Sequence, residues 1–182
     1  MPVTVVATAL PEVFILEPAL FADARGSFFE SFHAREFAQA TGLVREFVQD
    51  NHSTSAPGVL RGLHYQLVKP QGKLLRVVRG RIFDVAVDLR RSSPRFGQWV
   101  GVTLSAEDRR QLWIPEGFGH GFAVVGEEAE VLYKTTEYRY AEHERTIRWD
   151  DPTLGISWPV TGTPILSAKD ADAVRLDQAE VY

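Results

Sequence analysis

Apolar and polar residues alternate along most of this chain of 182 residues, and a period of two is typical of β-strands. The alternation is clearest in the segment 82–89, where every odd position is apolar and the even positions include Asp84 and Asp88. The run before this segment ends in the triplet RGR (79–81), which predicts a tight hairpin. Further strands are predicted at 13–17, 26–32, 44–53, 58–66, 97–104, 110–114, 119–125, 129–138 and 145–149.

Helical signals are sparse in comparison. The segment 33–42 predicts a short helix that ends at Gly42, and the segment 167–176 predicts another, which begins with Ser167 and Asp170 in capping-box spacing. Many short strands with two small helices predict an all-β fold, either a sandwich or a barrel. A jelly roll of two antiparallel sheets with short peripheral helices fits this pattern, although the period alone does not separate it from an immunoglobulin-like sandwich.

The composition narrows the class of protein. With no repeat or linker in the sequence, we expect one domain over residues 1–182, with a C-terminal helical segment from about residue 165. The absence of cysteine excludes disulfides and permits a reducing compartment. The net charge of −4 argues against a nucleic-acid partner but allows a small anionic ligand where a few basic residues converge. Since the sequence shows neither a signal peptide nor an apolar run of roughly 20 residues, we expect a cytoplasmic protein with no membrane partner.

The segment GVLRGLHYQ (58–66) contains the first candidate for chemistry. As a regular strand it would place Arg61 and Leu63 on one face and His64 on the other. Of the five histidines, only His64 and His120 lie in strand-like contexts flanked by glycine. A metal site in a barrel usually needs three or four histidine and carboxylate ligands, often two residues apart on one strand, and neither histidine has such a neighbour. We therefore expect no metal, and either a half-buried structural histidine or one that transfers protons.

A histidine that transfers protons works best when a carboxylate orients its ring. Asp170 and Asp84 are the candidates, although the spacing from Ser167 by itself favours a helix cap for Asp170. Tyr133 alternates with apolar residues in its strand and is either a packed core residue or a general acid. Lys73 is either a solvated lysine or a cation beside a developing negative oxygen. These residues predict a β-barrel pocket with a candidate base, and they do not name a substrate.

Seven blocks of the chain resemble one family, the dTDP-4-dehydrorhamnose 3,5-epimerases of the cupin superfamily. The blocks are, in family order, PEVFILEPALFADARGSFFESF, EFVQDNHSTSAPGVLRGLHYQ, QGKLLRVVRGRIFDVAVDLR, WIPEGFGHGFAV, VLYKTTEY, IRWDDPTLGISWP and LSAKD. They span roughly residues 11–172, and the pattern NHSxSxxGVLRGLHYQ is specific to this family. The resemblance implies a cupin-type jelly-roll barrel with no metal or other cofactor, and a homodimer that shares strands across its interface.

The resemblance also implies residue roles. In the family pattern, His64 of RGLHYQ is the catalytic base and Asp170 of SAKD orients it. Tyr133 of YKTT corresponds to the acid, and Lys73 of QGKL to a lysine near the sugar ketone. Substrate-binding positions correspond to Arg25, Glu30, Gln49, Asn51, Arg61, His120, Tyr138, Glu144 and Lys169.

The chain departs from the family pattern after YKTT. Many members carry paired tyrosines there, whereas Arg139 separates Tyr138 from Tyr140 in this chain. We expect Tyr138 to stack on the thymine base, with the planar guanidinium of Arg139 as the alternative.

The activity that the resemblance implies is an isomerase reaction on a small nucleotide sugar. A 4-keto-6-deoxyhexose, dTDP-4-dehydro-6-deoxyglucose, would be inverted at C3 and C5 through an enolate to give dTDP-4-dehydrorhamnose. Three alternatives stay open: a relative that inverts only C3 or only C5, a barrel that binds a sugar nucleotide without catalysis, and a metal-dependent cupin. Single and double epimerases need the same base, acid and oxyanion site, so the sequence does not separate them.

Overall fold

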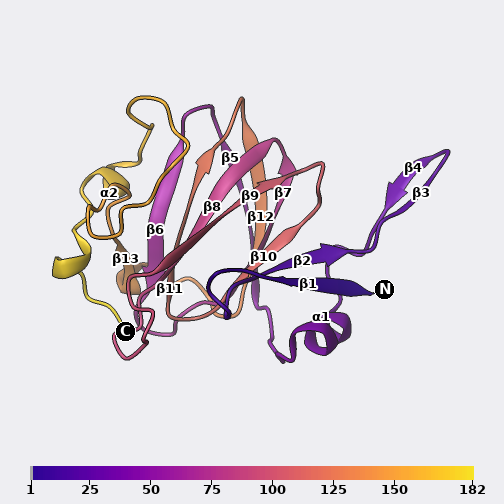
Figure 1. Cartoon of the computed structure of the whole chain (residues 1–182), viewed down its shortest axis with the longest axis horizontal. Helices are drawn as coiled ribbons and strands as arrows, with labels where there is room; N and C mark the ends of the chain where they lie inside the picture. The colour runs from indigo at the N-terminus through magenta and orange to yellow at the C-terminus, as the bar shows by residue number, and fades with distance from the viewer. Residues whose placement is uncertain (1) are drawn as a thin grey trace.

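Two antiparallel sheets face each other in the computed structural model, which describes residues 2–182, and together they form a jelly roll (Figure 1). The six-stranded sheet contains, in spatial order, β1 (Val3–Ala7), β2 (Phe14–Pro18), β10 (Gln111–Ile114), β7 (Lys73–Arg79), β12 (Ala129–Thr135) and β5 (Gln49–Ser55). The five-stranded sheet contains β13 (Glu144–Thr146), β6 (Leu60–Gln66), β11 (Phe118–Val124), β8 (Arg81–Asp88) and β9 (Trp99–Ser105). The predicted all-β fold class is confirmed.

The remaining elements are small and peripheral. Strands β3 (Phe21–Asp23) and β4 (Gly26–Phe28) form a hairpin that projects from the body of the molecule (Figure 1). The helices are α1 (Ala34–Thr41) and α2 (Ala168–Ala171), with single 3₁₀ turns at Ala141–His143 and Leu176–Gln178. Within residues 2–182, neither helix has the length and apolar character needed to cross a membrane.

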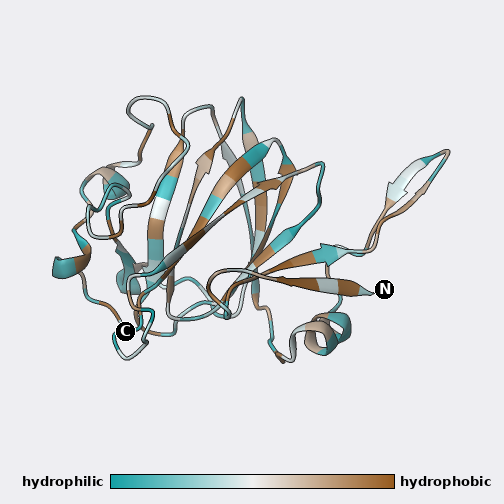
Figure 2. Cartoon of the chain, in the orientation of Figure 1, coloured by the Kyte–Doolittle hydropathy of each residue, from teal (hydrophilic) through white to brown (hydrophobic). Residues whose placement is uncertain are grey.

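The alternation predicted for the segment 82–89 accounts for how β8 is buried on both faces. Ile82 and Ala86 point between the two sheets and belong to the main core. Val85 and Val87 point to the outer face, where the C-terminal segment covers them with residues such as Leu176. Because both faces are covered, hydrophobic residues are frequent along the strands in Figure 2.

Several predicted elements are corrected by the structure. The triplet 79–81 forms no hairpin, because β7 and β8 belong to different sheets and the chain crosses between them at Gly80. Gly80 has a φ of 72°, and a Cβ at this position would lie 1.9 Å from the carbonyl oxygen of Glu128. Only glycine fits this crossing. The predicted helix 167–176 is also shorter, since α2 ends at Ala171.

At the N-terminal end, β1 and β3 are strands that the pattern did not predict. Strand β1 is an edge strand that pairs only with β2, and most of its residues are exposed on the surface. Helix α1 does end at Gly42 as predicted, with a left-handed φ of 73°. It packs on the outer side of the six-stranded sheet, where Phe37 contacts the ring of Trp113.

Candidate active site

Strand β6 carries a bulge that brings Arg61 and His64 onto the same face. His120 of β11 pairs with His64, and Phe122 pairs with Arg61, so an interval of two residues on β11 spans three on β6. Directly paired residues point to the same face of a sheet, and Phe122 belongs to the core between the sheets. The expectation that Arg61 shares a face with Leu63, opposite His64, is therefore wrong, because the extra residue reverses the alternation.

Two glycines permit this local geometry. Gly62 has a φ of 115°, and a Cβ on it would lie 2.5 Å from the Cα of Gly121 on β11. A Cβ on Gly121 would in turn lie 2.6 Å from the carbonyl oxygen of Arg61. Side chains at these positions would push β6 and β11 apart, so the glycines allow the bulge that aims His64 inward.

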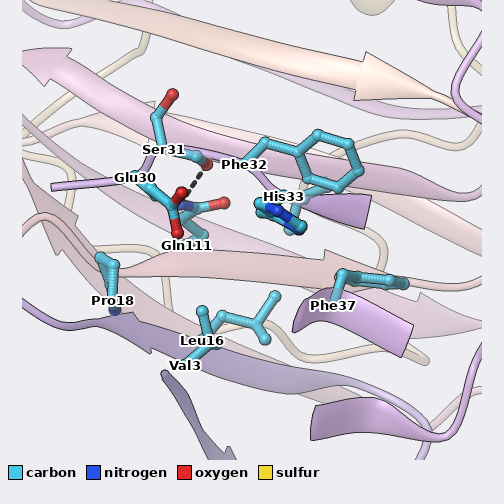
Figure 3. Close-up of a pocket in the computed structure, with 10 residues that line it drawn as sticks. Val3, Leu16, Pro18, Glu30, Ser31, Phe32, His33, Phe37 and Gln111 are labelled. Carbon is cyan, nitrogen blue, oxygen red and sulfur yellow. Dashed lines mark hydrogen bonds between the residues drawn. The ribbon is translucent and has the colours of Figure 1, made fainter. Parts of the chain in front are cut away.

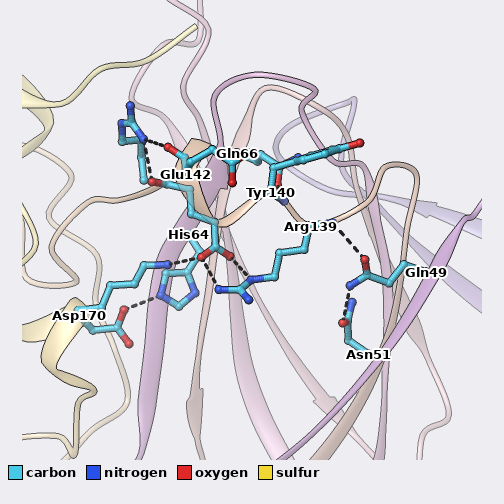
Figure 4. Close-up of polar contacts among 11 residues, drawn as sticks. Gln49, Asn51, His64, Gln66, Arg139, Tyr140, Glu142 and Asp170 are labelled. Atoms are coloured by element: carbon cyan, nitrogen blue, oxygen red, sulfur yellow. Dashed lines mark hydrogen bonds and ion pairs between the residues drawn. The ribbon is translucent and has the colours of Figure 1, made fainter.

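His64 forms a pair with Asp170, the aspartate of α2. The ring Nε2 lies 2.5 Å from Asp170 Oδ1 (Figure 4). The Asp170 backbone N–H donates to Ser167 Oγ at 3.2 Å. Asp170 therefore takes part in the helix cap through its backbone while its carboxylate contacts the histidine. With Nε2–H donated to the carboxylate, Nδ1 keeps the lone pair that a base needs.

The charges of this pair favour a neutral histidine beside an ionised carboxylate. Burial lowers the pKa of His64, with smaller contributions from Lys169 and Lys73, and the hydrogen bond to Asp170 only partly offsets this. Burial alone would raise the pKa of Asp170, but the hydrogen bonds that its carboxylate accepts bring its pKa below the ordinary value. Near neutral pH, the ring of His64 is therefore able to accept a proton.

A second buried group of charges lies on the interior face. His120 Nε2 lies 2.9 Å from Asp84 Oδ2, so this aspartate orients His120 rather than His64. Lys73 is the first residue of β7, and its Nζ lies 3.5 Å from the carbonyl oxygen of His64. Burial lowers the pKa of Lys73 to about 8, although the carboxylates of Asp84 and Glu144 act in the opposite direction.

Tyr133 faces His120 and Asp84 from the opposite sheet, and it lies beside Lys73 in its own sheet. It lies on β12 and lines a small pocket together with Arg61, Lys73 and His120. Burial raises the pKa of Tyr133, so its hydroxyl keeps its proton at neutral pH. His64 and Tyr133 therefore belong to the two different walls of the barrel, with the ammonium of Lys73 beside the pocket that Tyr133 lines.

The rim of this region carries a cluster of charged side chains. Glu144 accepts two hydrogen bonds from the guanidinium of Arg139, both 2.9 Å long, and a third at 3.2 Å from Lys169 (Figure 4). The hydrogen bonds from Arg139, helped by Lys169, lower the pKa of Glu144 to about 2. Tyr138 lies next to this cluster in the chain with 54% of its surface exposed.

Gln49 and Asn51 lie on β5, whose Asn51 pairs directly with Tyr133 of β12. Gln49 Nε2 donates to Asn51 Oδ1 at 2.8 Å, and its Oε1 accepts from the backbone N–H of Arg139 at 3.1 Å. Both residues thus lie beside the candidate site, with their amide groups joined to each other.

Arg25 and Glu30 are not brought to this pocket within one chain. Arg25 lies in the turn of the projecting hairpin, where its side chain is 89% exposed and paired with Asp23. Glu30 lines a different, mostly apolar pocket against the six-stranded sheet, near Phe32 and Leu74 (Figure 3).

No group of three or more histidine, aspartate or glutamate side chains that could hold a metal ion occurs among the described residues 2–182.

The sequence did not predict the contacts of Arg139 with Glu144 and Gln49, nor those of Gln66, a buried glutamine at the end of β6 that bonds to the backbone of Tyr138 and Tyr140. The only signal for Gln66 was its place in the block RGLHYQ, two residues after His64.

Comparison with known proteins gives one consistent family. The family profile of dTDP-4-dehydrorhamnose 3,5-epimerase matches residues 7–178. The chain is 57% identical to the dTDP-4-dehydrorhamnose 3,5-epimerase of Pseudomonas aeruginosa over 174 residues, which covers 96% of each chain. It is also 42% identical to the dTDP-4-dehydrorhamnose 3-epimerase of Streptomyces niveus, with coverage of 92% of this chain and 81% of that protein.

A solved structure agrees with this result. The dTDP-6-deoxy-D-glucose-3,5-epimerase of Legionella pneumophila, crystallised in complex with dTDP-4-keto-L-rhamnose, superposes with a TM-score of 0.95 at 49% identity. The match covers 98% of this chain and 95% of that one. The chain therefore belongs to the dTDP-4-dehydrorhamnose 3,5-epimerase family.

Proposed function

We propose that this protein inverts C3 and C5 of dTDP-4-dehydro-6-deoxyglucose and so produces dTDP-4-dehydrorhamnose. The observation that carries the proposal is the placement of a His–Asp pair on one wall of the barrel and a partly buried tyrosine on the other. These are His64 with Asp170, and Tyr133, with the ammonium of Lys73 beside the pocket. Members of the matched family are named for this reaction.

The chemistry follows from the ketone at C4 of the sugar. The carbonyl acidifies the C–H bonds at C3 and C5, because the electron pair left by the proton delocalises onto the ketone oxygen. His64 takes the proton, and Lys73 and His120 stabilise the enolate oxygen. Donors placed in this way contribute about 3–4 kcal/mol each in other enzymes. Tyr133 then donates a proton to the opposite face of the carbon, which inverts the centre. Solvent takes the proton from His64 and returns one to Tyr133, and the same steps then invert the second carbon.

We also propose that the protein is a homodimer in which the β3–β4 hairpin of one protomer reaches the partner's pocket. The hairpin projects from the body, and Phe21 and Phe28 on it are 50% and 61% exposed. Such apolar surface is usually covered by a partner. This arrangement would bring Arg25 to a diphosphate that it does not reach within one chain. Sedimentation velocity tests the dimer, and it should give a monomer for a variant that lacks residues 21–28.

A single C3 epimerase is the second candidate, because a relative at 42% identity carries that name. Incubation with dTDP-4-dehydro-6-deoxyglucose in heavy water separates the two. Deuterium at both C3 and C5 supports the double epimerase, and deuterium at C3 alone supports the second candidate. Absence of deuterium at either carbon would reject both and leave a protein that only binds the nucleotide sugar.

The same assay tests the base. His64→Asn should abolish exchange at both carbons and leave the affinity for dTDP within about threefold of the wild type, because the residue acts on the sugar. His52→Asn, at an exposed histidine of β5 that pairs with Glu130, is the matched control and should exchange normally. Exchange by His64→Asn at a rate near that of the wild type would show that another group removes the proton.

A further inference from the structure

Four consecutive residues at the rim, 137–140, are held by glutamine side chains. We call this segment the rim loop. Gln71 Nε2 donates to the carbonyl oxygen of Glu137 at 2.9 Å, and Gln66 Nε2 donates to that of Tyr138 at 3.1 Å. The backbone N–H of Arg139 donates to Gln49 Oε1 at 3.1 Å, and that of Tyr140 donates to Gln66 Oε1 at 2.7 Å.

These contacts replace the backbone ladder that ends with β12. The rim loop has no regular secondary structure, so its buried polar groups need other partners. Gln66 is only 2% exposed, and its Nε2 also donates to the carbonyl oxygen of Lys69 at 2.6 Å, so its amide is fully engaged. Gln66 ends β6 of the five-stranded sheet, whereas Gln49 begins β5 of the six-stranded sheet. The rim loop is thus fixed to both sheets at once.

The rim loop presents two side chains that suit a nucleotide. Tyr138 offers a half-exposed aromatic ring. Arg139, labelled in Figure 4, offers a guanidinium that Glu144 holds in place. Aromatic rings stack on bases, and a guanidinium binds phosphate oxygens or stacks on a planar ring. A loop that is already ordered before the ligand arrives loses less conformational entropy when it binds.

We propose that Gln49, Gln66 and Gln71 form a clamp that presets the rim loop for the nucleotide half of the substrate. They are positioning residues that act through Tyr138 and Arg139, and this inference rests on the proposed function for the identity of the ligand. The clamp also explains why Gln66 follows His64 by two positions. Strand β6 carries the base, and its last residue, Gln66, holds the rim loop.

The experiment compares Gln66→Glu and Gln71→Glu with Gln98→Glu, a control at an exposed glutamine before β9. Each change keeps the side-chain shape and replaces the donating amide with a second oxygen. Calorimetry with dTDP should show affinity weakened about 5- to 30-fold for the first two variants and by less than about twofold for the control. The rate of deuterium exchange at saturating substrate should stay within about threefold of the wild type, so KM changes and kcat does not.

If Gln66→Glu does not fold, Gln71→Glu still tests the clamp, because Gln71 is only partly buried and lies apart from His64 in the sequence. Affinity of Gln71→Glu for dTDP within about twofold of the wild type would overturn the clamp, as would a fall in kcat as large as the fall in affinity. The proposed function can fail while the clamp holds. In that case the wild type exchanges no deuterium, which rejects the epimerase, while the affinities of the variants for dTDP still follow the predicted order, which supports the clamp.

Discussion

Replacing Lys73 by methionine should stabilise the protein while it removes activity. The side chain is 8% exposed and occupies the interior of the barrel, where an ammonium is costly to bury. The lowering of the Lys73 pKa from 10.5 to about 8 corresponds to about 3 kcal/mol of destabilisation at pH 7, at 1.36 kcal/mol per pH unit. Methionine is similar in length and carries no charge. We expect Lys73→Met to raise the free energy of unfolding by up to about 3 kcal/mol.

The sign of the pH dependence gives the sharper test. Below about pH 8 the lysine is protonated in both the folded and the unfolded state, so its destabilising effect is complete. Above its ordinary value of 10.5 it is neutral in both states, and the effect disappears. The stability advantage of Lys73→Met should therefore shrink between pH 8 and 10.5, because the wild type gains stability relative to the variant over that range.

Urea unfolding at several pH values measures this difference. Lys134→Met, on the adjacent strand β12 at a surface ion pair with Asp50, is the matched control and should not be more stable than the wild type at pH 7, because its ammonium lies outside the barrel interior. In the exchange assay, Lys73→Met should lower the rate of deuterium exchange by about 10²–10³-fold, since it removes one donor to the enolate oxygen. A variant that is less stable than the wild type at pH 7, or an advantage that does not change with pH, would refute the account of Lys73 as a buried cation.

Three further predictions concern the remaining groups of the pocket. Asp170→Asn should lower the exchange rate by about 10²–10⁴-fold, because the amide no longer holds the ring tautomer. Ser167→Ala should cost about 1 kcal/mol of stability and lower the rate far less, because it removes one partner of the carboxylate but keeps the His–Asp pair; equal rates for both would contradict the pair. Tyr133→Phe should retain exchange at C3 or C5 and lose product formation, as followed by NMR, and loss of both together would argue against separate acid and base. The profile of kcat/KM against pH should rise through the lowered pKa of His64, below 6.5, and fall as Lys73 loses its proton near 8. A profile that still rises above pH 8 would count against a protonated Lys73.

Local patterns were enough for most of the fold. The period of two located nearly all strands of both sheets and correctly predicted that Asp84 lies on the same face as Ile82 and Ala86. The left-handed turn at Gly42 also followed from the sequence. In contrast, the triplet 79–81 has the residues of a hairpin but crosses between sheets, and at the crossing it lies against the backbone of Glu128, just before β12 and about fifty residues later in the chain.

The candidate site was predicted less from pattern than from resemblance. Spacing alone favoured a helix cap for Asp170 and did not choose between Asp170 and Asp84 as the partner of His64, since 106 residues separate His64 from Asp170. The alternation did not show the bulge in β6 either, although Gly62 in the block RGLHYQ is a signal for it, because a glycine inside a strand often marks a bulge. Resemblance supplied the pairing of His64 with Asp170, and the structure places the two side chains in contact.

The sequence by itself determined the class of fold and the chemical groups available to it, because strand periodicity and side-chain chemistry are local properties. Only the tertiary structure decided that Asp84 meets His120 and that three glutamines meet one loop. The physical reason is that these contacts depend on how two sheets pack and where a strand bulges, and packing joins residues that no local pattern relates.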